Sequence, residues 1–228
     1  MTESQSNVQA ERAPAVVGPR QLRRKPKSER YEEVLAAAAR VFAESGYRAS
    51  TIHDITSELD MTGAALYHYV EGKEDLLVAI CQRAGDRLHD AAKEIMALDL
   101  PPEEKLRKFF HRHLELVDAD RPIFKILIQE RSELPADRVE ELLNGERAYL
   151  ATVRGLLEQF QLQALAGLDP TLAALAMVGM LNWTIRWYRP DGRYRLDELA
   201  EEFFRMFALG VLRSPALRRR AEAPPETN

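Results

Sequence analysis

Apolar residues recur every three or four positions through most of the chain, which is the period of an α-helix. The first such segment covers residues 29–44, where Tyr31, Leu35, Ala38 and Phe42 form an apolar stripe on one face. No segment between turn signals shows the convincing alternation that is typical of a β-strand. The pattern therefore predicts an all-α protein of about nine helices.

Capping residues, glycine and proline mark where these helices begin and end. Gly46 suits the end of the first helix, Thr51 and Asp54 have the spacing of a capping box, and Thr62 is a second N-cap residue. Prolines at or near several expected starts are compatible with a first helical turn. The expected helices are residues 29–44, two short helices after Thr51 and Thr62, and residues 73–97, 102–118, 121–132, 136–163, 170–188 and 196–213.

The two ends of the chain lack this periodicity and divide it into four parts. Residues 1–27 form a polar, basic arm and residues 214–228 a polar tail, and both are expected to be disordered. Residues 28–88 are expected to form a small head with a helix-turn-helix at 51–70, and residues 89–213 a larger helical body. The basic cluster between Arg20 and Arg30 would enter a DNA minor groove or act as a solubilising tail, and both interpretations stay open.

Charge and cysteine content narrow the class of protein. A net charge of -4 over 228 residues argues against nucleic-acid binding by the whole surface, although a local basic patch is compatible with it. Cys81 is the single cysteine, so an intramolecular disulfide is impossible and a reducing cytoplasm is expected. The most apolar run, Leu172 to Trp183, is shorter than the roughly 20 residues of a membrane span. We therefore expect a cytoplasmic protein without a membrane partner.

The two short helices after Thr51 and Thr62 are separated by a tight turn at Asp60-Met61. The first of them is too short to be stable alone and has to pack its apolar side, with Ile55, against the preceding helix. That packing leaves the second helix projecting, which is the helix-turn-helix arrangement that fills a DNA major groove. The pattern predicts a DNA-binding head.

Residues 28–88 resemble the DNA-binding domain of the TetR family of bacterial repressors. The resemblance is carried by the glycine-aromatic pair after the first helix, two Thr caps, an Asp-Ile pair, an aromatic-His-aromatic triplet and a Lys-Glu pair before leucines: Gly46-Tyr47, Thr51, Asp54-Ile55, Thr62, Tyr67-His68-Tyr69 and Lys73-Glu74. It implies an all-helical homodimer that binds a double-stranded operator through its head. It also implies a ligand pocket in the body and release from DNA when a ligand enters.

The resemblance also assigns DNA contacts by position. Thr51 and Thr62 begin helices, where backbone N–H groups and hydroxyls suit phosphate, although both are equally explained as plain caps. Lys73 opens the following helix and would meet another phosphate. The residues expected at the DNA are Arg48, Ser50, Thr51, Thr62, Gly63, Ala64, Ala65, Tyr67, His68, Tyr69 and Lys73.

Two positions depart from the family pattern. Asp60 stands where the family has glycine, and aspartate tolerates the left-handed backbone better than most residues. Gly63-Ala64 stands where a longer polar residue followed by glycine is common, and small residues touch thymine methyls without making a bidentate bond. Base specificity would then rest on Tyr67, His68 and Arg48, on DNA shape or on the basic arm.

A second segment, Leu181 to Gly192, is similar to a TetR subgroup linked to fatty-acid and steroid catabolism, some members of which sense acyl-CoA thioesters. The helix from Leu172 is apolar all round and is expected to be buried on most sides. Arg186 on this helix needs a partner, either an anionic effector group or a carboxylate at the dimer interface. Aromatic and Met residues at helical spacing suit an effector pocket or a plain core, and the candidate effector contacts are Phe109, Phe110, His113, Phe124, Tyr149, Met177, Trp183 and Arg186.

Three functions compete: a repressor released by a ligand, a ligand-blind architectural DNA-binding protein with the same head, and a helical enzyme. The enzyme has little support, because the chain lacks a GxSxG, GxGxxG or Walker motif. His111 and His113 lie about 200° apart around a helix and cannot share one metal. A di-iron bundle needs paired Glu-x-x-His motifs, and Asp86-x-x-His89 is a single approximate match. We expect no enzymatic activity, cofactor or metal.

Overall fold

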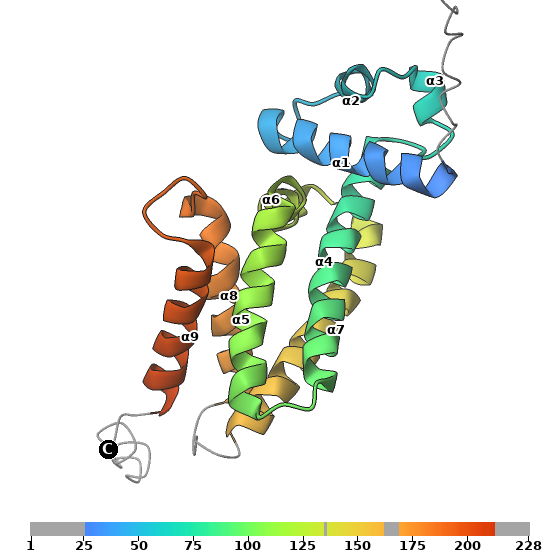
Figure 1. The fold of residues 1–228 in the computed structure, drawn as a ribbon. Helices are drawn as coiled ribbons and strands as arrows, with labels where there is room; N and C mark the ends of the chain where they lie inside the picture. Colours follow the sequence, from blue (N-terminus) through green and yellow to red (C-terminus); the bar gives the residue numbers. More distant parts are fainter. Residues whose placement is uncertain (1–25, 135, 162–168, 213–228) are drawn as a thin grey trace, which may run out of the picture.

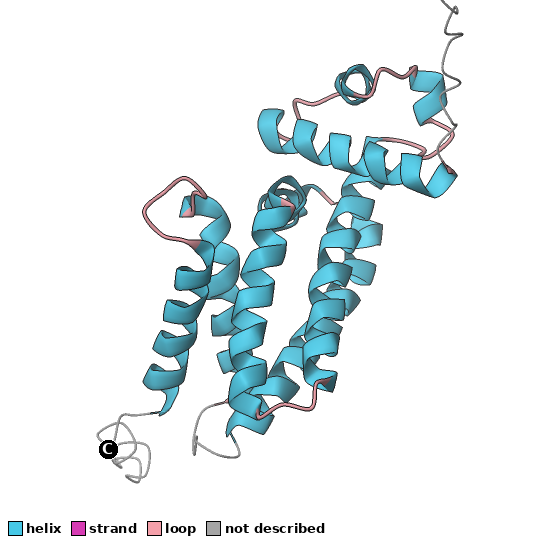
Figure 2. Ribbon diagram, viewed as in Figure 1, coloured by secondary structure: helices cyan, strands magenta, loops and turns pink. Residues whose placement is uncertain are grey.

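The computed structural model describes residues 26–134, 136–161 and 169–212, and these ranges contain helices and no strand (Figures 1 and 2). The all-α prediction is confirmed. The tail at 214–228 and all but the last two residues of the basic arm at 1–27 lie outside the described residues.

The head consists of three helices, α1 (Lys27–Ser45), α2 (Ile52–Glu58) and α3 (Gly63–Leu66). The expected capping box is present: the Thr51 hydroxyl accepts from the Asp54 backbone N–H at 3.2 Å, and the Asp54 carboxylate accepts from the Thr51 backbone N–H at 2.7 Å. Asp60, at the turn before α3, has a φ of 50°, the left-handed conformation expected of it. Local signals in the sequence therefore define the helix-turn-helix.

The body contains α4 (Lys73–Ala97), α5 (Pro102–Ala119), α6 (Arg121–Gln129), a 3₁₀ turn η1 (Arg131–Glu133), α7 (Ala136–Gln161), α8 (Pro170–Trp187) and α9 (Leu196–Leu212). These bounds lie within two residues of the predicted ones except at the helix expected over 121–132. That helix ends at Gln129, and η1 follows it. Leu134 is extended, as a residue before proline prefers, so the chain cannot continue helically into Pro135.

The head lies across one end of the body (Figure 1). α1 packs on α6 and on the start of α4, while the remainder of α4 runs down the body against α5 and α7. α5 also packs on α9, and α7 packs on α8. α4 and α6 therefore belong to both parts of the molecule.

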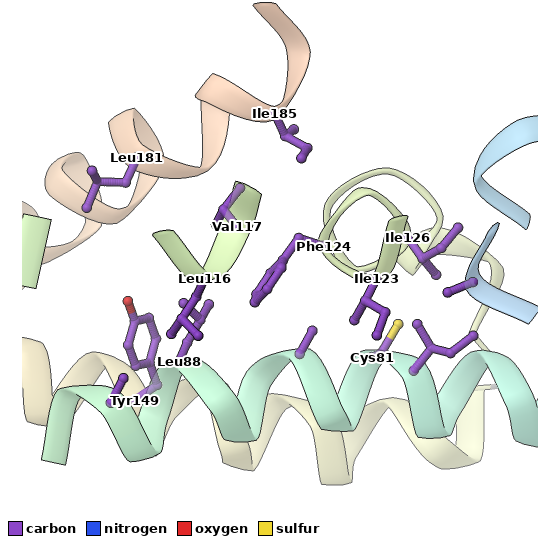
Figure 3. Packing of buried hydrophobic residues seen from close by; sticks show 14 of the residues in the cluster. Cys81, Leu88, Leu116, Val117, Ile123, Phe124, Ile126, Tyr149, Leu181 and Ile185 are labelled. Atoms are coloured by element: carbon purple, nitrogen blue, oxygen red, sulfur yellow. The ribbon is translucent and has the colours of Figure 1, made fainter. Parts of the chain in front are cut away.

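Side chains from α4, α5, α6, α7 and α8 meet in one apolar core, part of which Figure 3 shows. Phe124 of α6 is completely buried and points toward this core, together with Leu181 of α8. Removing such large apolar side chains from water is the main favourable contribution to folding. Cys81 of α4 is also fully buried, and burial raises the pKa of its thiol to about 12, so the thiol stays protonated.

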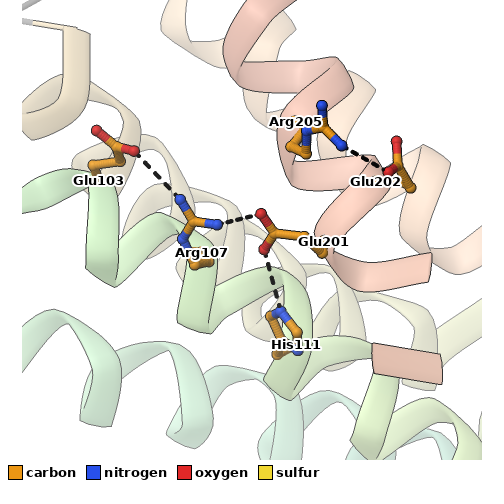
Figure 4. A network of polar contacts seen from close by, with 6 residues as sticks. All are labelled: Glu103, Arg107, His111, Glu201, Glu202 and Arg205. Atoms are coloured by element: carbon orange, nitrogen blue, oxygen red, sulfur yellow. Dashed lines mark hydrogen bonds and ion pairs between the residues drawn. The ribbon is translucent and has the colours of Figure 1, made fainter. Parts of the chain in front are cut away.

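An ion-pair network ties α9 to α5 (Figure 4). The Arg107 guanidinium pairs with Glu201 and lies 4.2 Å from the centre of the Phe204 ring, and His111 Nε2 lies 3.7 Å from the same carboxylate. The hydrogen bond from Arg107 lowers the pKa of Glu201. Because these groups are about one-third exposed, the network contributes more to the orientation of α9 than to stability.

α8 is buried on one side only, contrary to the expectation that most of its surface would be covered. Met177 and Leu181 face the core, whereas Leu172 and Trp183 are 67 % and 59 % exposed. Met206 of α9 is likewise 62 % exposed. A single copy of the chain thus leaves an apolar face open on its last two helices. No helix in the described part of the chain has the length and hydropathy needed to cross a membrane.

Candidate DNA-binding surface and ligand cavity

Helix α3 is a single turn, and the rest of the head holds it in place. Leu66, at its end, is completely buried, and Val70 just beyond it is nearly so. Its first residue follows Thr62, whose hydroxyl accepts from the Ala65 backbone N–H at 3.2 Å. The residues left exposed are Thr62, Ala64, Tyr67 and His68, while Gly63, Ala65 and Tyr69 are half-buried. The structure therefore gathers the predicted α3 residues, and four of them face solvent.

Lys73 holds the loop between α1 and α2. Its Nζ donates to the carbonyls of Tyr47 at 2.7 Å and Ser50 at 2.9 Å, lies 3.5 Å from the Arg48 carbonyl, and sits 4.3 Å from the centre of the Tyr47 ring. An ammonium group has three N–H donors, and these carbonyls use them. The phosphate contact predicted for Lys73 would require its ammonium to leave one of these carbonyls.

Ser50 and Arg48, on the same loop, have opposite environments. Ser50 is 3 % exposed and its hydroxyl donates to the Tyr47 carbonyl at 2.8 Å, so its side chain is turned inward. Arg48 is largely exposed, and its Nε lies 2.7 Å from the Glu133 carboxylate in η1. Arg48 therefore connects the predicted DNA surface directly to the body.

The body contains a cavity of about 560 Å³ between α4, α6, α7 and α8. Leu127, Leu142, Leu150 and Val178 form much of its apolar wall. This volume lies within the range of about 300–1,000 Å³ that is typical of small-molecule sites. The body is therefore not a filled core, as a ligand-blind protein would have.

Among the Asp, Glu, Arg and Lys residues of the cavity wall, carboxylates predominate, and Gln82, His89, Tyr149 and Asn182 are its other polar residues. Asp86, Glu141 and Glu146 contribute carboxylates, and Arg131 contributes the one guanidinium among the described lining residues. Arg131 pairs with Glu146 at 2.6 Å, so the charges of these two residues offset each other. Asp86 and Glu141 leave the wall with a negative balance.

A buried hydrogen-bonded chain stands beside the cavity. His113 of α5 is 2 % exposed; its Nδ1 lies 3.0 Å from the Tyr149 hydroxyl, and its Nε2 lies 3.0 Å from Asn182 Oδ1. Burial lowers the pKa of His113 to about 4, with the Asn182 hydrogen bond opposing that shift, so the ring is neutral at pH 7. Burial also raises the pKa of Tyr149. Tyr149 and Asn182 line the cavity, whereas His113 stands behind them.

The structure divides the eight predicted effector residues. Tyr149 lines the cavity. The rings of Phe109 and His113 pack directly against Tyr149 and do not line the cavity themselves. Trp183 and Arg186 lie on the exposed face of α8, where the guanidinium is 5.4 Å from the centre of the Trp183 ring and water can solvate it. Three others are completely buried and do not line the cavity: Phe110, Phe124 and Met177.

Sequence reasoning missed most of the polar lining of the cavity. The sequence pattern presents Asp86 and His89 only as an approximate metal motif, and among the described residues no cluster of three or more metal-ligating groups forms. Asn182 interrupts the most apolar run in the chain, and an isolated amide in such a run could have indicated a polar residue at the cavity. Arg131 and Glu146 carried no local signal, because their pairing depends on how α7 folds back beside η1.

A helix-turn-helix head on an all-helical body with a mostly apolar cavity defines a DNA-binding regulator that responds to a ligand. Residues 34–80 match the family model of bacterial regulatory proteins of the tetR family, and residues 99–211 match the tetracyclin repressor-like C-terminal domain. The chain belongs to the TetR family of transcriptional regulators.

Three relatives align with this chain over nearly their whole length. The HTH-type transcriptional repressor KstR2 of Rhodococcus jostii is 28 % identical over 196 residues, which cover 81 % of this chain and 92 % of that protein. PfmR of Thermus thermophilus is 30 % identical with a TM-score of 0.72, covering 79 % of this chain and 99 % of PfmR. AibR, solved with isovaleryl coenzyme A and operator DNA, is 27 % identical with a TM-score of 0.71, covering 78 % of this chain and 97 % of AibR.

Tyr67→Ala is expected to weaken operator binding by about 1–3 kcal/mol, because the exposed tyrosine stands at the predicted DNA contact. Its thermal unfolding midpoint should stay close to that of the wild type, since the side chain is 56 % exposed. Tyr194→Ala is the matched control, at a similarly exposed tyrosine between α8 and α9. Equal affinities of the two variants for the operator would contradict the assignment.

The neutral state of His113 predicts a pH-dependent stability. The unfolded chain binds a proton at this residue near pH 6.5, whereas the folded chain does so only near pH 4, so stability falls as the pH decreases between these values. For His113 alone, the free energy of unfolding should decrease by about 2 kcal/mol from pH 7.5 to pH 5. Urea titrations of His113→Gln should show a decrease smaller by that amount, while His53→Gln, at an exposed position, should retain the wild-type dependence. An unchanged dependence in His113→Gln would contradict the prediction.

Proposed function

We propose that the protein is a homodimeric repressor that leaves a palindromic operator when an acyl-CoA thioester or a related lipid metabolite enters the cavity. The observation that carries this proposal is the cavity itself, which lies beside helices α4 and α6 that also contact the head. The name of KstR2 supports repression, and the complex of AibR with isovaleryl coenzyme A and operator DNA supports an acyl-CoA effector.

The turn η1 offers a short route from the cavity to the DNA surface. Arg131, its first residue, lines the cavity and pairs with Glu146 of α7. Glu133, its last residue, pairs with Arg48 of the head. A ligand that displaces Arg131 would move this turn and with it the partner of Arg48. In this proposal, the effector favours one position of η1 and the DNA favours another, so binding of one weakens binding of the other.

A second connection lies one helix earlier. Lys125 of α6 donates a hydrogen bond from Nζ to the backbone carbonyl of Ala43, near the end of α1. Leu127, on the same helix, lines the cavity. A shift of α6 on ligand entry would therefore pull on the end of α1 and reorient the head.

The alternative of a ligand-blind architectural protein is less consistent with the cavity, because such a protein has no need of an open volume in its body. An enzymatic activity is not proposed, since the relatives named above are regulators. Because operator DNA lies in the bacterial cytoplasm, we place the protein there.

Binding to the DNA upstream of its own gene is expected to be tight and salt-sensitive, because phosphate contacts dominate such affinity. Fluorescence anisotropy with the full chain measures it, first without ligand and then with a panel of acyl-CoA esters and free fatty acids. Release by the esters is the expected result. Binding that no compound releases would contradict the effector proposal, and genome-wide footprinting would then show whether another operator behaves differently.

The homodimer is proposed from the exposed apolar face of α8 and α9. Leu172, Leu175, Trp183 and Met206 are between 48 % and 67 % exposed. Exposed apolar side chains grouped on two adjacent helices are typical of an interface between chains. A second copy placed on this face would form a four-helix bundle and direct two α3 helices at successive major grooves, about 34 Å apart on an inverted repeat.

Trp183→Glu is expected to convert the dimer to a monomer, because it places a charge in the centre of that interface. Sedimentation velocity should show about half the wild-type mass, and operator affinity should fall at least tenfold because one head binds one half-site. Leu98→Glu, at an exposed leucine that ends α4, serves as the control and should remain dimeric. A dimeric Trp183→Glu variant would rule out this face as the interface.

A further inference from the structure

We propose that Asn182 recognises the chemical class of the effector: its side-chain N–H group donates to the carbonyl oxygen of an uncharged acyl group, an ester or thioester, and the mostly apolar wall disfavours the carboxylate of a free acid. This inference rests on the proposed function, since it takes the cavity as the effector site. It goes further by naming the group that recognises the ligand and the ligand chemistry that the group selects.

The position of protons in the buried chain follows from its donors and acceptors. A neutral imidazole has one N–H, and a carboxamide oxygen can only accept. Because His113 Nε2 faces Asn182 Oδ1 at 3.0 Å, Nε2 carries the proton and donates it. Nδ1 then has a lone pair, which accepts from the Tyr149 hydroxyl at 3.0 Å. With Oδ1 engaged by the ring, the nitrogen of the Asn182 amide is the atom that does not face His113.

The nitrogen of Asn182 is consequently the part left for a ligand. Asn182 lines the cavity and is half-buried, and its Nδ2 has no hydrogen-bond partner among the described residues. In the described part of the chain, one fully buried polar side-chain atom lacks a partner, and that atom is Asp118 Oδ1. Nδ2 of Asn182 is therefore accessible, and the cavity that the residue borders is the space to which it opens.

The charges on the cavity wall bear on whether a charged or an uncharged ligand binds. Asp86 and Glu141 lack a compensating cation on the wall, because Arg131 is paired with Glu146. Asp86 and Glu141 are themselves exposed, so water screens their repulsion of a bound carboxylate. The larger cost to a carboxylate ligand is the loss of its hydration beside the apolar wall, which offers it no unpaired guanidinium. An ester or thioester offers the same acceptor oxygen without the charge.

The apolar remainder of the cavity suits an alkyl or ring system attached to this carbonyl. Leu127, Ile128 and Leu150 line it together with Leu175 and Val178 of α8. These side chains offer no further hydrogen bonds, so they contribute through burial of apolar surface. The carbonyl contact with Asn182 then orients an otherwise apolar ligand.

The test measures direct binding of three probes to the full chain at pH 7.5 by isothermal titration calorimetry, without DNA. Methyl octanoate carries an uncharged carbonyl, methyl octyl sulfide replaces it by a weak acceptor, and octanoate carries a charge. The ester is expected to bind at least about fivefold more tightly than the sulfide, as the loss of one hydrogen bond predicts. It should exceed octanoate by a similar factor, because octanoate loses the hydration of its charge on entering the cavity.

Two substitutions remove the donor in different ways. Asn182→Ala removes the amide without adding a charge, and Asn182→Asp retains an acceptor for His113. In both, the preference for ester over sulfide should fall below about twofold, and Asn182→Asp, which keeps the acceptor for His113, separates loss of the donor from loss of the buried hydrogen bond. Asn144→Asp, on the exposed surface of α7, is the matched control and should retain the wild-type preference.

A preference for the ester that survives in both Asn182 variants would overturn this inference, and so would tighter binding of octanoate or no binding of any probe. The readout does not involve the operator. A protein that prefers the ester but is never released from DNA would contradict the proposed function and leave the role of Asn182 supported. Release from DNA by acyl-CoA esters, without any preference for the ester probe, would support the proposed function and contradict the role of Asn182.

Discussion

The rest of the structure depends on the packing of the apolar side of helix α4 against its neighbouring helices. Leu76, Leu77 and Ile80 are completely buried at its head end, and Leu88 and Ile95 continue the buried side into the body. An unbroken helix of 25 residues transmits a displacement at one end to the other, because its backbone hydrogen bonds resist local bending. The position of the DNA-binding head is thereby tied to the packing around the cavity.

The same body combines a rigid core with one incompletely filled region. Phe124 and Leu181 fill the centre, whereas the space beside Tyr149 remains open. Keeping His113 neutral and hydrogen-bonded in this dry environment costs stability at low pH, as its lowered pKa shows. A buried polar chain of this kind is best explained by specificity, since an apolar replacement would pack without that cost.

Polar contacts join the head to the body beside the apolar packing of α1. Arg48 meets Glu133, and Lys125 meets the Ala43 carbonyl, whereas the packing of α1 on α6 and α4 supplies the apolar contact. Exposed ion pairs contribute little free energy and exchange readily with other partners such as phosphate. In the proposed release from DNA, such contacts would let the head take another position without unfolding of either part.

The sequence by itself determined the helices and the class of head, because caps such as Thr51 with Asp54, and the left-handed turn at Asp60, act within a few residues of each other. Its periodicity could identify buried faces, but it could not say which buried residues border a cavity. Tyr149, Asn182 and Arg131 come from three separate elements, and Phe110, itself a predicted pocket residue, is plain core. Only the tertiary packing decided this, since the volume left between helices depends on how every side chain around it fits.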